Sequence, residues 1–348
     1  MKKHFQIAVG LVLFCIATIS QAQDQPTTKT YQNYDFVPGD RIVFEDNFTD
    51  DASGEFPSHW DLLSGQALLT TFKGEKVFAL TEGNYVSIMP LLESDNYLDI
   101  DAFTIEFDFY TQPGAYNQVG LRLWDPKNRE QGEDLTDEEN AVWFGYESRA
   151  HQLSGSYPRS NEEFSDDAWH HAAMARKGTQ LKLYIDQYRV LTVPVFKAKT
   201  FSLNIVGIGD QDRPIMLKNI RVAQGGNFND IKHLVTETRI ITHGILFDVE
   251  KATIKPPSMG TLNQICQLMK DHPEFKFEIG GHTDNTGTAG HNLVLSQQRA
   301  DAVKTQLVSM GIDAGRLTTK GYGDSQPMQD NISVEGRANN RRVEFVKQ

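Results

Sequence analysis

The sequence predicts two domains of different fold class, an all-β sandwich followed by an α/β domain. Over residues 40–223, short runs of alternating apolar and polar side chains are separated by turn residues. After a stretch that contains two glycines, strand-length apolar runs alternate with segments whose apolar residues recur at helical spacing. Many short, regularly punctuated strands are typical of a sandwich, and strands that alternate with helices are typical of an α/β domain.

The first 22 residues have the pattern of a secretory signal peptide. Two lysines precede an apolar run over residues 7–19, and Ser20 and Ala22 place small residues where a cleavage site requires them. The run is shorter than a typical membrane span, and no other stretch reaches the ~18 apolar residues that a transmembrane helix needs. Cys15 raises the alternative of a lipoprotein signal, but Phe14 stands before it where such signals have a small residue.

The composition excludes several kinds of partner. The 34 basic and 46 acidic side chains give a net charge of −12, and loss of the two signal lysines leaves 32 against 46, or −14. Such a surface argues against nucleic acid and against a basic lipid-binding patch. Cys266 would be the only remaining cysteine, so no internal disulfide is expected. Residues 23–39 lack any apolar period and predict a flexible leader.

The first domain resembles a known group of sandwiches in two segments. Residues 169–176 (WHHAAMAR), a turn at 178–180 and residues 181–186 (LKLYID) are similar to the central hairpin of concanavalin-like or laminin G-like domains, and residues 215–222 resemble their closing strand. Gln187 stands where that family has a glycine. The resemblance implies a jelly roll, and it leaves open whether the domain holds a glycan, a protein, calcium or nothing. The predicted strands are residues 41–44, 77–80, 85–89, 103–110, 118–124, 141–146, 170–176, 181–185, 189–194, 205–209 and 215–222.

One predicted strand of this domain resembles the catalytic strand of a glycoside hydrolase. Alternation places Glu106, Asp108 and Tyr110 on one face of the strand. Laminarinase-type glucanases, which resemble this arrangement, carry Glu-x-Asp-x-Glu, and a retaining hydrolase needs two carboxyl groups about 5 Å apart. Tyr110 replaces the second glutamate, so we expect a solvated strand face and no enzyme.

Other candidate ligands in this domain have ordinary explanations. Asp210 and Asp212 suit a hairpin turn as well as a calcium site. A tryptophan such as Trp60, Trp124 or Trp143 is more often part of a sandwich core than a sugar platform. We therefore expect no metal and no cofactor.

The second domain follows a predicted linker at residues 224–234. Residues 240–247 predict a strand, and Pro256 opens a helix that includes Cys266, which we expect to be a small buried hydrophobe. Residues 275–279 predict the next strand, and Asn292 or Ser296 is expected to cap the following helix. A strand at 316–322, a short helix at 336–340 and a strand at 341–346 complete the pattern.

A carboxylate and an arginine stand at a suggestive spacing in this domain. Asp284 follows the strand, and Arg299 lies fifteen residues later on the predicted helix. A fixed carboxylate accepts hydrogen bonds from an ammonium group, and a guanidinium holds a carboxylate in a fork. Asn292 and Arg299 are seven residues apart, so they project from one helix face toward the loop that carries Asp284. This pattern suits a zwitterionic ligand.

Residues 235–348 resemble the OmpA-like C-terminal domain, the peptidoglycan-binding module of Gram-negative envelopes. The resemblance implies binding to diaminopimelate, which carries an ammonium and a carboxylate on one carbon. The matching motifs occur in the family's order at residues 245–248 (ILFD), 281–284 (GHTD), 295–303 (LSQQRADAV), 321–323 (GYG) and 339–344 (NNRRVE).

The same resemblance implies roles for single residues. Asp284 and Arg299 match the ligand-binding aspartate and arginine, Asn292 a supporting asparagine, Thr286 a contact position and Arg341 an arginine near the pocket. The segment around Val249 and Glu250 departs from the family pattern, so no contact is assigned there. His282 has no second metal ligand at a suitable spacing, and we expect it to be structural.

We therefore expect a non-enzymatic protein of the Gram-negative envelope, located in the periplasm and associated with the cell wall and outer membrane. Its second domain would bind peptidoglycan and tether a sandwich whose own ligand is a glycan or an envelope protein. Three alternatives remain open: a glycan-active enzyme, an outer-membrane barrel porin, and a stator-like motor subunit with a retained transmembrane helix.

Overall fold

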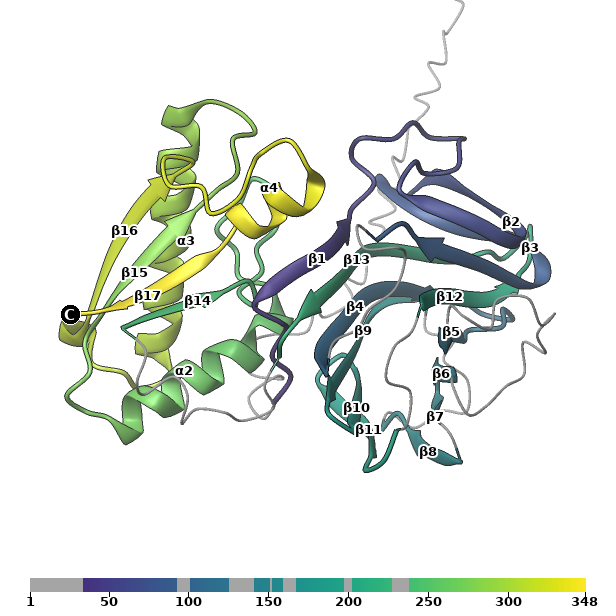
Figure 1. The fold of residues 1–348 in the computed structure, drawn as a ribbon, viewed down its shortest axis with the longest axis horizontal. Helices are drawn as coiled ribbons and strands as arrows, with labels where there is room; N and C mark the ends of the chain where they lie inside the picture. The colour runs from purple at the N-terminus through teal and green to yellow at the C-terminus, as the bar shows by residue number, and fades with distance from the viewer. Residues whose placement is uncertain are drawn as a thin grey trace, which may run out of the picture.

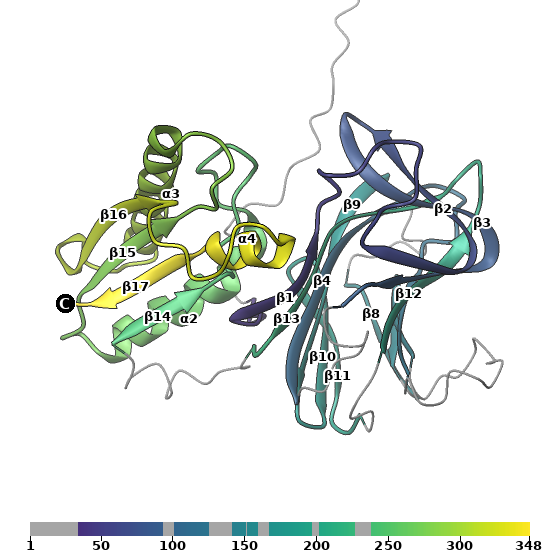
Figure 2. The ribbon, with the colours of Figure 1, turned by 45° about the horizontal axis from the view of Figure 1, so that its top comes forward.

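The computed structural model describes residues 34–92, 101–124, 141–150, 152–158, 167–196, 202–226 and 238–348, which form two domains (Figures 1 and 2). The expected signal peptide at 1–22, the leader up to residue 33 and the linker from residue 227 lie outside these residues, as does the side chain of Trp124. None of the helices in the described part of the chain has the length and apolar character needed to span a lipid bilayer.

The N-terminal domain is mostly β. Its strands form one 13-stranded sheet with the order β11-β10-β9-β4-β13-β3-β12-β5-β6-β7-β8, while β1 pairs with β13 and β2 with β3. The strands are β1 (Arg41–Asp46), β2 (Trp60–Phe72), β3 (Glu75–Pro90), β4 (Ala102–Thr111), β5 (Val119–Trp124), β6 (Ala141–Phe144), β7 (Glu147–Ala150), β8 (Leu153–Ser156), β9 (Ala168–Lys177), β10 (Gln180–Ile185), β11 (Tyr188–Val193), β12 (Ser202–Gly209) and β13 (Ile215–Gln224).

This sheet curves until it is nearly closed. Its two terminal strands meet at Gly155 of β8, where a side chain would lie 1.9 Å from the carbonyl oxygen of Val190 in β11. Alternate residues of the strands point inward, and large apolar side chains such as Phe78, Phe107 and Phe144 fill the interior. The two halves of the sheet therefore face one another across a single core (Figure 2).

Three strands of this domain were not predicted. The longest, β2, pairs with β3 alone and exposes most of its side chains, so it lacks the apolar alternation that marks a half-buried strand. Gly65 has a φ of 76° beside an irregularity in the β2–β3 register. The other two, β7 and β8, are only four residues long each.

The C-terminal domain packs helices against a four-stranded sheet of order β14-β17-β15-β16, in which β15 and β16 are parallel. Leu262, Ile279, Val303 and Phe345 belong to its core. The elements are β14 (Arg239–Thr242), η2 (Pro256–Ser258), α2 (Met259–Asp271), β15 (Phe277–His282), α3 (Ala289–Ser309), η3 (Ala314–Arg316), β16 (Leu317–Gly323), α4 (Val334–Asn340) and β17 (Val343–Lys347). This confirms the predicted order of a β domain and an α/β domain.

Two predicted boundaries in this domain are wrong. The strand expected over residues 240–247 ends at Thr242, and Phe247 makes only an isolated bridge with Ile254. The helix expected to be capped by Asn292 or Ser296 begins earlier, because the Thr288 hydroxyl accepts from the backbone N–H of His291 at 3.3 Å. Asn292 and Ser296 are buried within α3.

The prediction of a flexible leader is wrong for residues 34–39, which are wedged between the two domains. Tyr34 and Phe36 are 2% and 0% exposed and pack on Tyr184 of β10 with ring centroids 5.5 and 5.3 Å away. From the other domain, Asn263 of α2 donates to the Tyr34 carbonyl oxygen at 3.1 Å. Gly260 permits the close approach of α2, since a Cβ there would lie 1.6 Å from the Phe36 carbonyl oxygen.

The face of β4 that was expected to be solvated is buried. Glu106 is 3% exposed, and His171 of the adjacent strand β9 lies between it and Asp108. His171 Nδ1 is 2.8 Å from Asp108 Oδ1, and Nε2 is 3.4 Å from Glu106 Oε2. Lys255 of the C-terminal domain lies near Asp108 and is one of the cations that hold its pKa down against the effect of burial.

The first strand of the β domain also contacts the last helix of the chain (Figure 1). The side chain of Asn339 in α4 accepts from the Ile42 N–H at 3.0 Å and donates to the Ile42 carbonyl oxygen at 2.8 Å. Arg337 donates to Asp50 at 3.0 Å. Strand β1 is therefore shared structurally by both domains.

Candidate functional site

The candidate site begins where β15 ends. Asp284 stands two residues after the strand and is 8% exposed. Its Oδ1 accepts from the Thr286 N–H at 2.9 Å, and its Oδ2 accepts from Nη1 of Arg341 at 2.6 Å. The side-chain amide of Asn292 donates to the Asp284 carbonyl oxygen at 3.3 Å. Four of the five predicted site residues therefore meet at this loop.

Glycines on β15 and β16 bring α3 close to the end of the strand. A side chain at Gly281 would lie 2.2 Å from the Ser296 carbonyl oxygen, and one at Gly321 would lie 2.6 Å from the Gln297 N–H nitrogen. The Ser296 hydroxyl in turn accepts from the Gly323 N–H at 2.9 Å. These approaches hold the first turns of α3 beside the loop that carries Asp284.

Arg299, the fifth predicted residue, is held by a different loop. Its Nε donates to the Lys251 carbonyl oxygen at 3.0 Å, and its Nη2 lies 3.4 Å from the Asp248 carbonyl oxygen. The guanidinium stands over the Phe247 ring, 5.0 Å from its centroid. Sequence reasoning assigned no contact to the loop at 248–251, and the structure shows that its carbonyl groups orient this arginine.

Asp284 and Arg299 keep their charges without neutralising one another. Burial alone would raise the pKa of Asp284, but the hydrogen bonds from Arg341 and Thr286 hold it below its usual value. Burial and the nearby charge of Arg341 lower the pKa of Arg299, while Glu250 and Asp284 act in the opposite direction. A guanidinium stays protonated under such conditions. No ion pair joins Asp284 to Arg299 within the described C-terminal domain. An anionic and a cationic group thus remain separately positioned.

His282 lies beside this site in a structural position. It is 3% exposed, and its ring stacks on Tyr322 with centroids 4.9 Å apart and planes inclined by 5°. Its Nε2 is 3.5 Å from Glu344 Oε1. Burial lowers the pKa of His282, so the neutral imidazole packs at the end of the strand.

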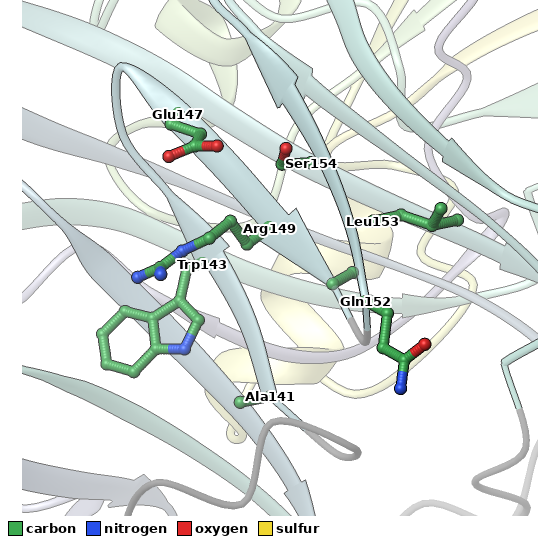
Figure 3. Close-up of a pocket in the computed structure, with 8 residues that line it drawn as sticks. Ala141, Trp143, Glu147, Arg149, Gln152, Leu153 and Ser154 are labelled. Atoms are coloured by element: carbon green, nitrogen blue, oxygen red, sulfur yellow. The ribbon is translucent and has the colours of Figure 1, made fainter.

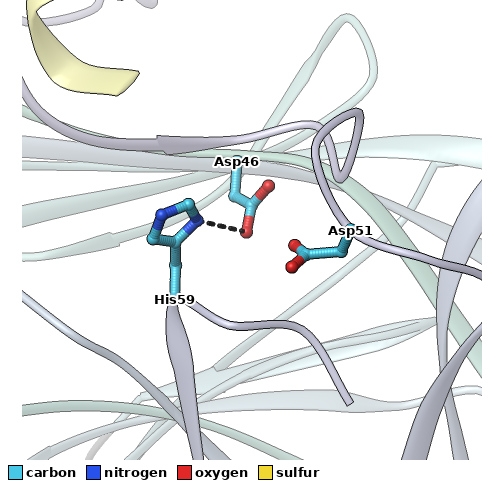
Figure 4. Close-up of side chains that lie close together, drawn as sticks. All are labelled: Asp46, Asp51 and His59. Carbon is cyan, nitrogen blue, oxygen red and sulfur yellow. Dashed lines mark ion pairs between the residues drawn. The ribbon is translucent and has the colours of Figure 1, made fainter. Parts of the chain in front are cut away.

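Asp46, Asp51 and His59 form the one group of potential metal ligands found among the described residues (Figure 4). Asp46 already accepts from the Trp60 indole N–H at 2.9 Å and from the Phe48 N–H at 2.7 Å. Those hydrogen bonds explain why the Asp46 carboxylate is buried, and they give it a role in stabilising the fold. Trp60 itself belongs to the hydrophobic core.

A small hollow lies along β6, β7 and β8 (Figure 3). Trp143, Glu147, Arg149 and Leu153 are among its lining residues, and its volume is about 190 Å³. Ligand pockets usually enclose about 300 Å³ or more. Trp143 packs edge-on against Tyr85, with ring centroids 6.4 Å apart, so its partial burial has a packing explanation.

The fold and the site define the class of the C-terminal domain. Residues 246–341 match the model of the OmpA family, so this part of the chain is an OmpA-family domain. The match confirms the corresponding part of the resemblance found in the sequence.

Individual relatives are similar over the same region. The probable lipoprotein YiaD of Escherichia coli is 41% identical over 104 residues, which are 30% of this chain and 48% of the relative. The peptidoglycan-binding protein ArfA of Mycobacterium bovis is 40% identical over 102 residues, 29% of this chain and 31% of the relative. The solved peptidoglycan-associated lipoprotein of Burkholderia pseudomallei is 28% identical, with a TM-score of 0.30, over 32% of this chain and 98% of that one. The chain thus spans less than half the length of the two sequence relatives.

One residue near the site was missed entirely. Glu45 of β1 accepts from Nη2 of Arg341, although it belongs to the other domain. Alternation along β1 indicates which side chains share a face, but no local signal tells which distant loop covers that face. The sequence alone therefore could not predict that Glu45 lies beside the site.

Proposed function

We propose that the C-terminal domain binds peptidoglycan through the diaminopimelate of its stem peptide. The observation that carries this proposal is the separate positioning of Asp284 and Arg299 on adjacent elements at the family's two ligand positions. The Asp284 carboxylate would accept hydrogen bonds from the ligand's ammonium, and the free donors of Arg299 would hold its carboxylate. Similarity to a relative named for peptidoglycan binding supports the ligand.

The remaining site residues have supporting roles in this proposal. Thr286 and Asn292 fix the Asp284 loop through its side chain and its carbonyl group, respectively. Arg341 keeps the Asp284 carboxylate ionised. A site held in this way loses little conformational entropy when the ligand arrives, which favours affinity.

We also propose that the N-terminal domain is a laminin G-like or concanavalin-like module that the C-terminal domain tethers to the cell wall. The signal-like pattern at residues 1–22 and the similarity to a probable lipoprotein support a place in the Gram-negative envelope, on the periplasmic side. A repeating polymer raises the effective concentration of binding sites, so even a weak single site keeps such a module localised.

Binding without catalysis is the activity we propose for the β domain. Glu106 and Asp108 are engaged by His171 on a face that is covered in the folded chain. Tyr110 bonds to Asp167 at 2.7 Å, in the position where a second carboxylate would be needed. Turnover of a β-glucan panel by the full chain would overturn this part of the proposal.

Sedimentation with purified sacculi tests the peptidoglycan site. We expect the unchanged protein to sediment with sacculi, and Asp284→Ala and Arg299→Ala each to remain in the supernatant. Asp271→Ala and Lys270→Ala are matched controls, because both are exposed at the end of α2, which leads into the opposite end of β15. Circular dichroism checks that all four variants fold. Sedimentation of both site variants at the unchanged level would exclude the assignment.

A further inference from the structure

Arg341 connects the candidate site to the N-terminal domain. One end of its guanidinium donates from Nη1 to Asp284 at 2.6 Å, and the other end donates from Nη2 to Glu45. Glu45 lies on β1, 296 positions earlier in the chain. A carboxylate of one domain therefore determines where a cation of the other domain's binding loop lies.

Glu45 is itself fixed by its own sheet. Strand β1 pairs with β13 so that Glu45 stands opposite Arg221, and Arg221 donates from Nε to Glu45 Oε1 at 2.8 Å and from Nη2 to the same oxygen. Burial alone would raise the pKa of Glu45, but Arg221 and Arg341 lower it to about 2. Glu45 is therefore a rigid anion at any physiological pH.

These contacts extend into a row of alternating charge. From the site inward, the row runs through Asp284, Arg341, Glu45 and Arg221, and Arg221 is also drawn electrostatically to Glu106. Each charge in the row is offset by its neighbours. Removing one member leaves the next with an uncompensated charge in a partly buried position, which is strongly unfavourable.

The charge of Glu45 matters for an ammonium group at Asp284. Without it, Arg341 would turn a full positive charge toward the carboxylate that the ammonium must approach. Like charges near a protein surface repel one another at this close range, so the charge of Arg341 opposes the approach of an ammonium group. Glu45 offsets this charge. It also takes the Nη2 donor of Arg341, so that Arg341 does not form a bidentate pair with Asp284.

We infer that Glu45 is a positioning residue that sets the specificity of the peptidoglycan site: by holding and neutralising Arg341, it preserves the affinity of Asp284 for the ammonium of a zwitterionic ligand. The inference rests on the proposed function. It also couples ligand binding to the docking of the two domains. If docking through Glu45 strengthens ligand binding at Asp284, then ligand binding strengthens docking by the same factor.

Two soluble tripeptides test the inference by titration calorimetry on the full chain. One ends in meso-diaminopimelate, and the other ends in 2-aminopimelate, which keeps the distal carboxylate and lacks the distal ammonium. We expect Glu45→Gln to weaken binding of the diaminopimelate peptide about tenfold, within the range of about 5- to 150-fold typical of coupled sites. Binding of the aminopimelate peptide should be unchanged or slightly tighter.

Asp50→Asn is the matched control, because it removes an ion pair between the same two domains, Asp50 with Arg337, without touching the site. It should bind both peptides as the unchanged chain does. Glu45→Asp, which keeps the charge beside Arg221 but is one methylene shorter toward Arg341, gives a second variant if Glu45→Gln fails to fold, and it should shift the preference in the same direction.

The outcomes separate this inference from the function on which it rests. Normal diaminopimelate binding by the folded Glu45 variants, or equal losses for both peptides, would overturn the role of Glu45 while leaving the site intact. Failure of the unchanged chain to bind diaminopimelate would instead remove the proposed function, and the inference with it.

Discussion

The buried histidine between β4 and β9 gives a quantitative prediction about pH. His171 faces Asp108 through Nδ1 and Glu106 through Nε2, so only the doubly protonated ring directs an N–H toward both carboxylates. Burial alone would lower the pKa of His171, but these two anions raise it from 6.5 to about 10. The imidazolium should therefore persist in the folded protein well above neutral pH.

The raised pKa links folding to proton binding. Below pH 6.5 both the folded and the unfolded chain carry this proton, so the stabilisation is complete. Above that pH the unfolded chain loses the proton first, and the stabilisation falls until the folded group titrates near pH 10. The difference corresponds to at most about 5 kcal/mol, and we expect a loss of about 3 to 5 kcal/mol in the free energy of unfolding across this interval.

Urea denaturation from pH 6 to 10 measures this loss. All four tryptophans lie in the N-terminal domain, so their fluorescence reports its unfolding. His171→Gln is the reference, because lysines and tyrosines titrate in it as they do in the unchanged protein. We expect the variant to be less stable at pH 6 and nearly equal at pH 10. Parallel pH profiles for the two proteins would refute a buried imidazolium.

Two further predictions concern stability. Phe36→Ala should lower the free energy of unfolding, measured by guanidinium titration, by about 3 to 5 kcal/mol, because the ring is fully buried between the domains. Leu62→Ala, at a site 42% exposed, should change that free energy by about 0.5 kcal/mol or less. Thr288→Ala should cost about 1 kcal/mol through loss of the α3 cap, and Thr288→Ser should restore most of it. A Phe36→Ala protein as stable as Leu62→Ala, or a Thr288→Ala protein as stable as Thr288→Ser, would contradict these assignments.

Local pattern predicted which residues of the C-terminal domain lie near one another, but not what surrounds them. The spacing of Asp284, Asn292 and Arg299 identified residues that the structure places around one loop and one helix, because these positions are close in sequence and joined by regular elements. The cap of α3 was misplaced because Asn292 and Ser296 are also good capping residues. In the structure Thr288 takes that role, because its hydroxyl accepts from the His291 N–H.

Contacts between the domains could not be read from the sequence. Strand alternation correctly grouped Glu106 with Asp108, yet it gave no information about what lies over that face. Tyr34 and Phe36 occur in a polar segment without periodicity, so nothing local marks them as core residues. Both errors have the same origin, since burial by a partner distant in the chain leaves no local period.

The wedge at residues 34–39 has a consequence for the order of folding. Tyr34 contacts Asn263, 229 positions later, and Ile42 contacts Asn339, 297 positions later. Synthesis delivers the N-terminal partners of these contacts long before their C-terminal partners, and contacts of such high sequence separation form slowly. Until α2 has folded, the aromatic rings of the wedge lack part of their covering surface and present apolar area to other chains. Folding of the C-terminal domain is thus the step that covers the wedge, so a chain truncated before residue 263 should aggregate more readily than the intact one.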